Sequence, residues 1–411
     1  MRRSDSPYSS TPSAGDAGPA RRALALVSLA TLLGMSLWFV GSALAPQLRE
    51  RWHLTAAETG WLTALVQLGF VAGTACAALL NLGDVVPARA LFAVSAAAAA
   101  LSSAALLVAP GFGAALASRF ATGFFLAGVY PPAMKMVATW YREGRGFAIG
   151  TLVGAITVGK ALPFLTHALG AGATQLVALV ASAGALVGAA LVGALYHDGP
   201  HPFERRAFTW SLAATALHDR STRLAIAGYL GHMWELYAMW TWLPAFIAAS
   251  FAARAAGAPG AHREIADLFG FCVIAAGGAG CVWGGWAASR AGYARVVTWC
   301  MAASGACALA IGLCFGGNPW LLFALSCVWG FFVVADSAQF SALVTEVAPS
   351  HAVGTALMFQ TSAGFLLTMA TIQLVPWCVE RFGWAWAFPA LALGPVFGIA
   401  AIARLPRRAA H

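Results

Sequence analysis

Long apolar runs separated by short polar gaps dominate the pattern of hydrophobic and polar positions along this chain. About twelve of these runs reach the length of ~20 residues that an α-helix needs to cross a bilayer. The pattern therefore predicts an all-α membrane protein with twelve transmembrane helices. The predicted helices cover residues 22–45, 58–80, 89–109, 113–137, 145–168, 174–196, 224–251, 267–288, 296–315, 320–345, 352–375 and 384–405.

A polar connection over residues 197–223 divides the predicted helices evenly and holds the longest run of charge. We therefore expect two six-helix bundles, over residues 22–196 and 224–405, joined by a cytoplasmic linker. Residues 1–21 are rich in Ser, Pro, Gly and Ala and are expected to form a disordered cytoplasmic tail. Residues 406–411 are expected to form a second, short cytoplasmic tail.

Composition agrees with this reading, because 60% of the residues are hydrophobic and only 9% are charged, against ~25% charged in soluble domains. The formal charge of +9 does not indicate nucleic-acid binding, since the basic residues cluster in alternate gaps between the helices. With the N-terminus in the cytoplasm, most Lys and Arg residues fall on the inside, as the positive-inside rule requires. The outside segments hold only Arg49, Arg51, Arg254, Arg263 and Arg381.

The two halves carry short matching segments, which fit a parallel internal duplication. Gly-Phe-Phe occurs at residues 123–125 and again at 330–332, and residues 145–148 resemble residues 353–356. Pro46 and Pro244 lie at matching places in the first helix of each half. Such a duplication places a binding site between pseudo-symmetric halves, near the bilayer midplane.

Two loops on the predicted cytoplasmic side combine small residues with charges. The loop over residues 80–89 contains Asp84 and Arg89, and the loop over residues 285–294 contains a further set, Gly285, Arg290 and Gly292. Both resemble the motif G-x-L-A-D-R-x-G-R-R of the major facilitator superfamily of permeases. The resemblance implies that these residues turn the loops tightly and hold helix ends together as the conformation changes.

Other segments extend the resemblance over the whole chain from about residue 22. Arg119 and Gly123 are similar to an R-x-x-x-G motif of the family, and the helix over residues 145–168 carries glycines spaced like its antiporter motif, without the expected Pro at Ala155. Residues 129–135 look like bacterial anion and small-acid permeases of this superfamily. The resemblance implies the fold of that family and a location in the bacterial cytoplasmic (inner) membrane.

Four ionisable residues lie inside apolar runs, at a cost of ~2.5–3.5 kcal/mol each on insertion scales. They are Arg119, Lys160, Glu235 and Asp336. Together they indicate a polar cavity within a helical bundle. We expect Arg119 and Lys160 to attract an anion, because guanidinium and ammonium groups bind carboxylates. Alternatively, backbone carbonyls or a carboxylate satisfy Arg119, and Lys160 extends its stem towards water.

The two carboxyl groups are candidates for proton coupling, because desolvation disfavours the charged form of a carboxyl group. His232 precedes Glu235 by three residues and shares its helix face. Asp336 and Gln339 lie on one stripe of another helix. The alternatives are a Glu235 that pairs with one of the two cations and an Asp336 that makes an interhelical bond.

Aromatic residues add weaker candidates, because most Trp and Tyr in membrane proteins lie at interfaces or in packing. Tyr130 and Trp234 complete the expected substrate-binding set, and Trp38, Trp240 and the amide of Gln67 are further candidates. The sequence contains no phosphate-binding loop and no nucleophile elbow. Its eight cysteines show no metal-ligand spacing, so we expect neither a metal nor a cofactor.

The sequence therefore predicts a secondary active transporter of a small polar or anionic organic solute. We expect alternating access, coupling to protons, a monomer in the lipid bilayer and no enzyme activity. An exporter of amphipathic compounds is the closest alternative, although the buried cations argue against lipophilic cations as its substrates. A membrane sensor that binds a solute without moving it is a second alternative, for which a soluble output domain is expected.

Overall fold

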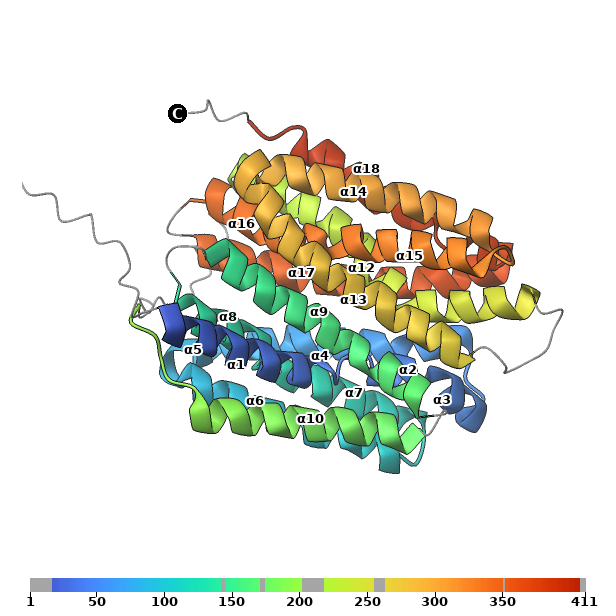
Figure 1. Ribbon diagram of the computed structural model, residues 1–411, viewed down its shortest axis with the longest axis horizontal. Helices are drawn as coiled ribbons and strands as arrows, with labels where there is room; N and C mark the ends of the chain where they lie inside the picture. Colours follow the sequence, from blue (N-terminus) through green and yellow to red (C-terminus); the bar gives the residue numbers. More distant parts are fainter. Residues whose placement is uncertain are drawn as a thin grey trace, which may run out of the picture.

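The chain folds into two helical bundles that lie side by side, as the computed structural model in Figure 1 shows. The structure describes residues 17–141, 145–170, 174–201, 218–254, 263–349 and 352–406. Within these ranges every regular element is helical, and eleven helices are long and apolar enough to cross a membrane. The predicted tails and linker fall mostly outside the described residues.

The first half of the chain supplies one bundle. Its elements are α1 (Ala17–Met35), α2 (Val40–Ala43), α3 (Ala45–Trp52), α4 (Ala56–Leu79), α5 (Leu82–Val85), α6 (Ala88–Ala104), η1 (Ala105–Val108), α7 (Phe112–Leu126), α8 (Tyr130–Ala138), α9 (Arg145–Leu169) and α10 (Thr174–Leu195).

The second half supplies the other bundle. Its elements are α12 (Arg220–Arg254), α13 (Arg263–Ala291), α14 (Tyr293–Ala310), η2 (Ile311–Cys314), α15 (Pro319–Ala335), α16 (Ser337–Val347), α17 (Val353–Phe382), η3 (Trp384–Trp386), η4 (Pro389–Ala392) and α18 (Leu393–Ile402). We call the end of the molecule that carries α3 and the start of α13 the outer end, following the orientation that the sequence predicts.

The first predicted helix is interrupted in the structure. It begins at Ala17, earlier than the sequence indicated, and α1 stops at Met35 before a turn leads into α2. The interruption and the two arginines near the start keep α1 out of the eleven apolar spans. Since α1 packs against α9 and α10, it still occupies the place of a twelfth helix in the bundle.

Two further helices break at corresponding places in the two halves. The fourth predicted helix is split into α7 and α8, and the prolines at 131 and 132 stand at the start of α8, where a missing N–H costs least. The tenth is split into α15 and α16 at Asp336. The two second segments start at Tyr130 and Ser337, which lie 207 residues apart (337 against 130).

The same spacing relates the glycine contacts within each half. A Cβ atom on Gly123 would overlap the carbonyl of Val66, and one on Gly330 would overlap the carbonyl of Val273. These pairs are 207 residues apart as well, 330 against 123 and 273 against 66. In each half the glycine lets two helices pack at backbone distance, α4 with α7 and α13 with α15.

The two bundles meet along two helix pairs, α9 with α13 and α4 with α17. The first pair is close because glycines face each other, with a Cβ on Gly154 lying 3.0 Å from the carbonyl oxygen of Gly278. On the second pair, the hydroxyl of Thr368 donates a hydrogen bond to Oε1 of Gln67. The interface therefore joins the halves by backbone contact and by a buried polar pair.

The loops that resemble the family motif differ in detail. Gly292 has φ +83°, a conformation that favours glycine, and it begins α14. The guanidinium of Arg290 lies 4.1 Å from the ring centroid of Trp286, and a Cβ on Gly285 would lie 3.4 Å from the carbonyl of Gly146 across the interface. Arg89 is exposed, and the side chain of Asp84 lies outside the described residues.

Candidate functional site

A small cavity of about 60 Å³ lies between the two bundles. Residues of α8 and α9 form its wall on one side, and residues of α12, α15, α16 and α17 form the other. The lining residues are Tyr130, Val153, Ile156, Thr157, Lys160, Tyr229, Met233, Leu236, Tyr237, Trp240, Val334, Ser337, Ser341, Thr361 and Phe365. We call it the central cavity.

Lys160 extends from α9 into this cavity and is 94% buried, since its exposed fraction is 6%. Its ammonium group donates a hydrogen bond to the hydroxyl of Tyr237, which belongs to the other bundle. Nζ also lies 4.3 Å from the ring centroid of Trp38 and 5.6 Å from that of Trp240. Ring faces attract the cation, so aromatic rings take the place that a carboxylate would fill in an ion pair.

The rings near Lys160 belong to a cluster that crosses the interface. Trp38 contacts Tyr237 at 5.7 Å and Phe365 at 5.5 Å between ring centroids, and Phe70 contacts Phe365 at 4.8 Å. Tyr130, expected to bind substrate, lines the cavity and stacks on Phe70. The indole N–H groups of Trp38 and Trp240 are buried and have no hydrogen-bond acceptor among the described residues.

Arg119 lies apart from the central cavity and is fully buried within the first bundle. Its Nη2 atom donates to the carbonyls of Leu37 at 3.0 Å and Trp38 at 2.5 Å, and its Nε atom donates to that of Leu62 at 3.3 Å. Leu37 and Trp38 form the turn between α1 and α2, where the broken helix leaves carbonyls without intrahelical partners. The backbone-carbonyl alternative from the sequence thus describes its contacts.

Glu235 is also buried away from the cavity, inside the second bundle. Its Oε1 atom accepts a hydrogen bond of 2.6 Å from the indole of Trp329, and its Oε2 atom accepts one of 2.9 Å from the hydroxyl of Ser304. Neither Arg119 nor Lys160 is its partner. Both carboxyl oxygens are therefore occupied by neutral donors from α14 and α15.

His232 and Asp336 form a buried pair beside the cavity. Nδ1 of His232 lies 2.9 Å from Oδ1 of Asp336, and both side chains are 2% exposed. Asp336 stands at the break between α15 and α16, next to Ser337, which lines the cavity. His232 lies near Tyr229, another lining residue, at 5.8 Å between ring centroids, so the pair adjoins the central cavity on two sides.

The remaining two candidates face elsewhere. The amide nitrogen of Gln339 donates to the carbonyl of Ala335 at 3.4 Å within its own chain segment. The indole of Trp234 donates to the carbonyl of Ala390 at 3.1 Å, on the side of the second bundle near α18. Neither lines the central cavity.

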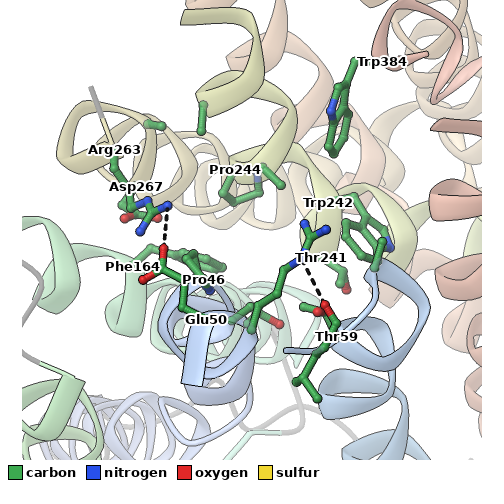
Figure 2. A pocket seen from close by; sticks show the side chains of 18 of the residues that line it. Pro46, Glu50, Thr59, Phe164, Thr241, Trp242, Pro244, Arg263, Asp267 and Trp384 are labelled. Atoms are coloured by element: carbon green, nitrogen blue, oxygen red, sulfur yellow. Dashed lines mark hydrogen bonds and ion pairs between the residues drawn. The ribbon is translucent and has the colours of Figure 1, made fainter. Parts of the chain in front are cut away.

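A larger cavity of about 650 Å³ opens between the bundles at the outer end (Figure 2). Its walls come from α3, α4, α9, α12 and α13, and from Trp384. Figure 2 shows Arg263 and Glu50 meeting across it, with 3.9 Å between Nη2 and Oε1. Both side chains are largely exposed, so solvent screens this ion pair strongly.

A chain of three polar side chains closes the interface at this end, and we call it the outer latch. Nδ1 of His167 lies 2.6 Å from Oδ2 of Asp267 in the other bundle, and Nε2 lies 2.5 Å from the side-chain amide of Gln47. His167 and Asp267 are both buried. Sequence reasoning missed the outer latch and Tyr237, because each residue sits near a helix end or resembles ordinary packing in an apolar run.

Comparison with solved structures identifies this arrangement. The fold is similar to the crystal structure of a mutant of the nucleoside transporter NupG, with a TM-score of 0.73, 14% sequence identity and coverage of 93% of this chain and 99% of that one. It is also similar to a bacterial homologue of the human lysosomal transporter Spinster in an inward-facing, unoccupied conformation, with a TM-score of 0.68, 15% identity and coverage of 97% and 95%. At these identities the similarity shows the fold.

Sequence comparison supplies the family. None of the curated proteins matches the chain. The family model of the Major Facilitator Superfamily matches residues 26–260, which is more than half of the chain. That family consists of transporters and not of enzymes. The protein therefore belongs to the Major Facilitator Superfamily and is one of its secondary transporters.

Proposed function

We propose that this transporter carries a small organic anion through the central cavity and that Lys160 binds the negative charge. The observation that carries the proposal is the charge of the cavity wall. Among the lining residues, Lys160 is the only Lys, Arg, His, Asp or Glu side chain. Since no carboxylate pairs with its ammonium group, an anionic solute can be its counter-ion.

The hydrogen-bonding groups around Lys160 support the same conclusion. The indole N–H groups of Trp38 and Trp240 are buried donors without acceptors in the described part of the chain, and both rings lie within 6 Å of Nζ. A buried donor without an acceptor costs ~1–3 kcal/mol. A solute that brings acceptor oxygens, as a carboxylate does, would reduce this cost.

Alternating access follows from the size and the construction of the cavity. About 60 Å³ is far below the ~300–1,000 Å³ typical of ligand sites, so the bundles must separate to admit a solute. The bond between Lys160 and Tyr237 joins the two bundles, and a solute that takes over Lys160 would break it. Binding of the anion would thereby loosen one contact that holds the halves together.

We assign proton coupling to the pair of Asp336 and His232. The pair is buried, adjoins the cavity through Ser337 and Tyr229, and stands at the break of α15 and α16, where the backbone can change conformation. Glu235 remains the second candidate, but Trp329 and Ser304 already occupy both its oxygens. We further propose a monomer in the bacterial inner membrane with both termini in the cytoplasm, which the distribution of Lys and Arg supports.

Uptake into proteoliposomes tests the proposal. Purified protein is screened with radiolabelled organic anions, neutral solutes and lipophilic cations, with and without a pH gradient. We expect saturable anion uptake that Lys160→Gln abolishes and Lys160→Arg, which keeps the positive charge, partly retains. Uptake or expulsion of lipophilic cations that is insensitive to Lys160→Gln would instead identify an exporter, and binding of an anion without flux would identify a sensor.

A further inference from the structure

We infer that the transported anion carries a single negative charge on an apolar or aromatic body. This inference rests on the proposed function, because it starts from Lys160 as the group that binds the charge. It adds the number of charges that the site can accept and the chemical nature of the rest of the solute.

The first step concerns Arg119, the second buried cation of the first bundle. Its guanidinium is already used by three backbone carbonyls, and two of them belong to the break between α1 and α2. It does not line the central cavity. Arg119 is therefore unavailable to a second carboxylate unless the first helix refolds.

The second step concerns the remaining wall of the cavity. No Lys, Arg or His other than Lys160 lines it within the described ranges, and the nearest ionisable groups beyond the wall are Asp336 and His232. Asp336 would repel a second negative charge, and His232 is turned towards Asp336. The desolvation of an unpaired charge at membrane depth corresponds to about a 100-fold loss of affinity.

The third step concerns the body of the solute. The wall opposite Lys160 is apolar, with aliphatic side chains from α9, α12 and α15 and the rings of Tyr229, Trp240 and Phe365. Its polar groups are neutral hydroxyls, on Thr157, Ser337, Ser341, Thr361 and the tyrosines. Such a wall favours ring stacking and apolar contact over a second ionic group.

Binding of matched acids to the wild-type protein tests this inference without any variant. Benzoate is compared with phthalate, and butyrate with succinate, by quenching of tryptophan fluorescence at pH 8, where all four acids are fully ionised. We expect each monoanion to bind at least about 30-fold more tightly than its dianion, and benzoate to bind more tightly than butyrate. Benzamide, which keeps the ring without the charge, is the control for the carboxylate.

A gain of charge provides the converse test. Thr157 precedes Lys160 by one helical turn and lines the cavity, so Thr157→Lys adds a second cation beside the first. We expect this variant to bind phthalate at least about tenfold more tightly than the wild type does.

The possible results separate the inference from the proposed function. If phthalate and succinate bind the wild type as tightly as their monoanions, and Lys160→Gln abolishes that binding, the single-charge inference is overturned and the anion transporter stands. If benzamide binds as tightly as benzoate, or Lys160→Gln changes nothing, the proposed function itself fails.

Discussion

Replacing Arg119 separates a structural role from a substrate-binding role in the first bundle. The structure gives its guanidinium three hydrogen bonds to backbone carbonyls, two of them in the turn that interrupts the first helix. Arg119→Gln shortens the side chain and removes the planar fork of donors, so most of these bonds are lost. We therefore expect the variant to be less stable and to retain its affinity for the anion.

The magnitude follows from the number of bonds. Hydrogen bonds from charged groups contribute ~1.5–3 kcal/mol each in soluble proteins, whereas polar contacts in membrane proteins average ~0.6 kcal/mol and reach ~1.7 kcal/mol. Three bonds of the membrane kind give a loss of about 2–5 kcal/mol in the free energy of unfolding. Arg119→Lys keeps the charge but offers no fork, so its loss should fall between zero and that of Arg119→Gln.

The assay is chemical unfolding in detergent micelles, paired with binding of benzoate to the same preparations. Lys160→Gln is the matched control, because it removes the other buried cation of the bundle at a site with no carbonyl partners. We expect Arg119→Gln to lower stability and Lys160→Gln to lower affinity. An Arg119→Gln variant that unfolds like the wild type but no longer binds benzoate would refute the structural assignment.

Three further predictions concern coupling, gating and packing. Asp336→Asn should reduce uptake driven by a pH gradient at least about tenfold while leaving exchange of labelled for unlabelled anion intact; equal losses of both would contradict the coupling role. Asp267→Asn removes the carboxylate of the outer latch and should widen the distance between spin labels on α3 and α13, and an unchanged distance would argue against a latch. Gly123→Ala and Gly330→Ala should each lower stability by ~1–3 kcal/mol in thermal unfolding, because a Cβ at either place overlaps a backbone carbonyl, whereas Gly354→Ala, with nothing within 4 Å, should not.

The sequence predicted the family and the helices because these depend on the length of apolar runs, which the bilayer fixes. It also predicted the relation between the halves, since the repeated Gly-Phe-Phe segments lie at equivalent helix contacts. It could not predict the breaks in the first and tenth helices. Hydropathy is unchanged at Met35 and Ala335, and only tertiary contacts decide that the chain leaves the helix there.

The four buried charges show where sequence reasoning ends. Each was identified from its apolar surroundings, but helical periodicity cannot tell which face of a helix meets the cavity. Lys160 lies in the central cavity, Asp336 adjoins it, and Arg119 and Glu235 bond to carbonyls and neutral side chains within single bundles. The difference depends on partners that are distant in the chain, such as Tyr237 for Lys160 and Leu37 for Arg119.

An experimental structure with a bound monocarboxylate tests the central role of Lys160 most directly. We expect the carboxylate to lie within hydrogen-bond reach of Nζ of Lys160, ~2.7–3.2 Å, with the bond to Tyr237 broken or shared. Arg119 should keep its backbone carbonyls in that structure. A carboxylate bound to Arg119, or held in the outer cavity while Lys160 still bonds Tyr237, would contradict the account.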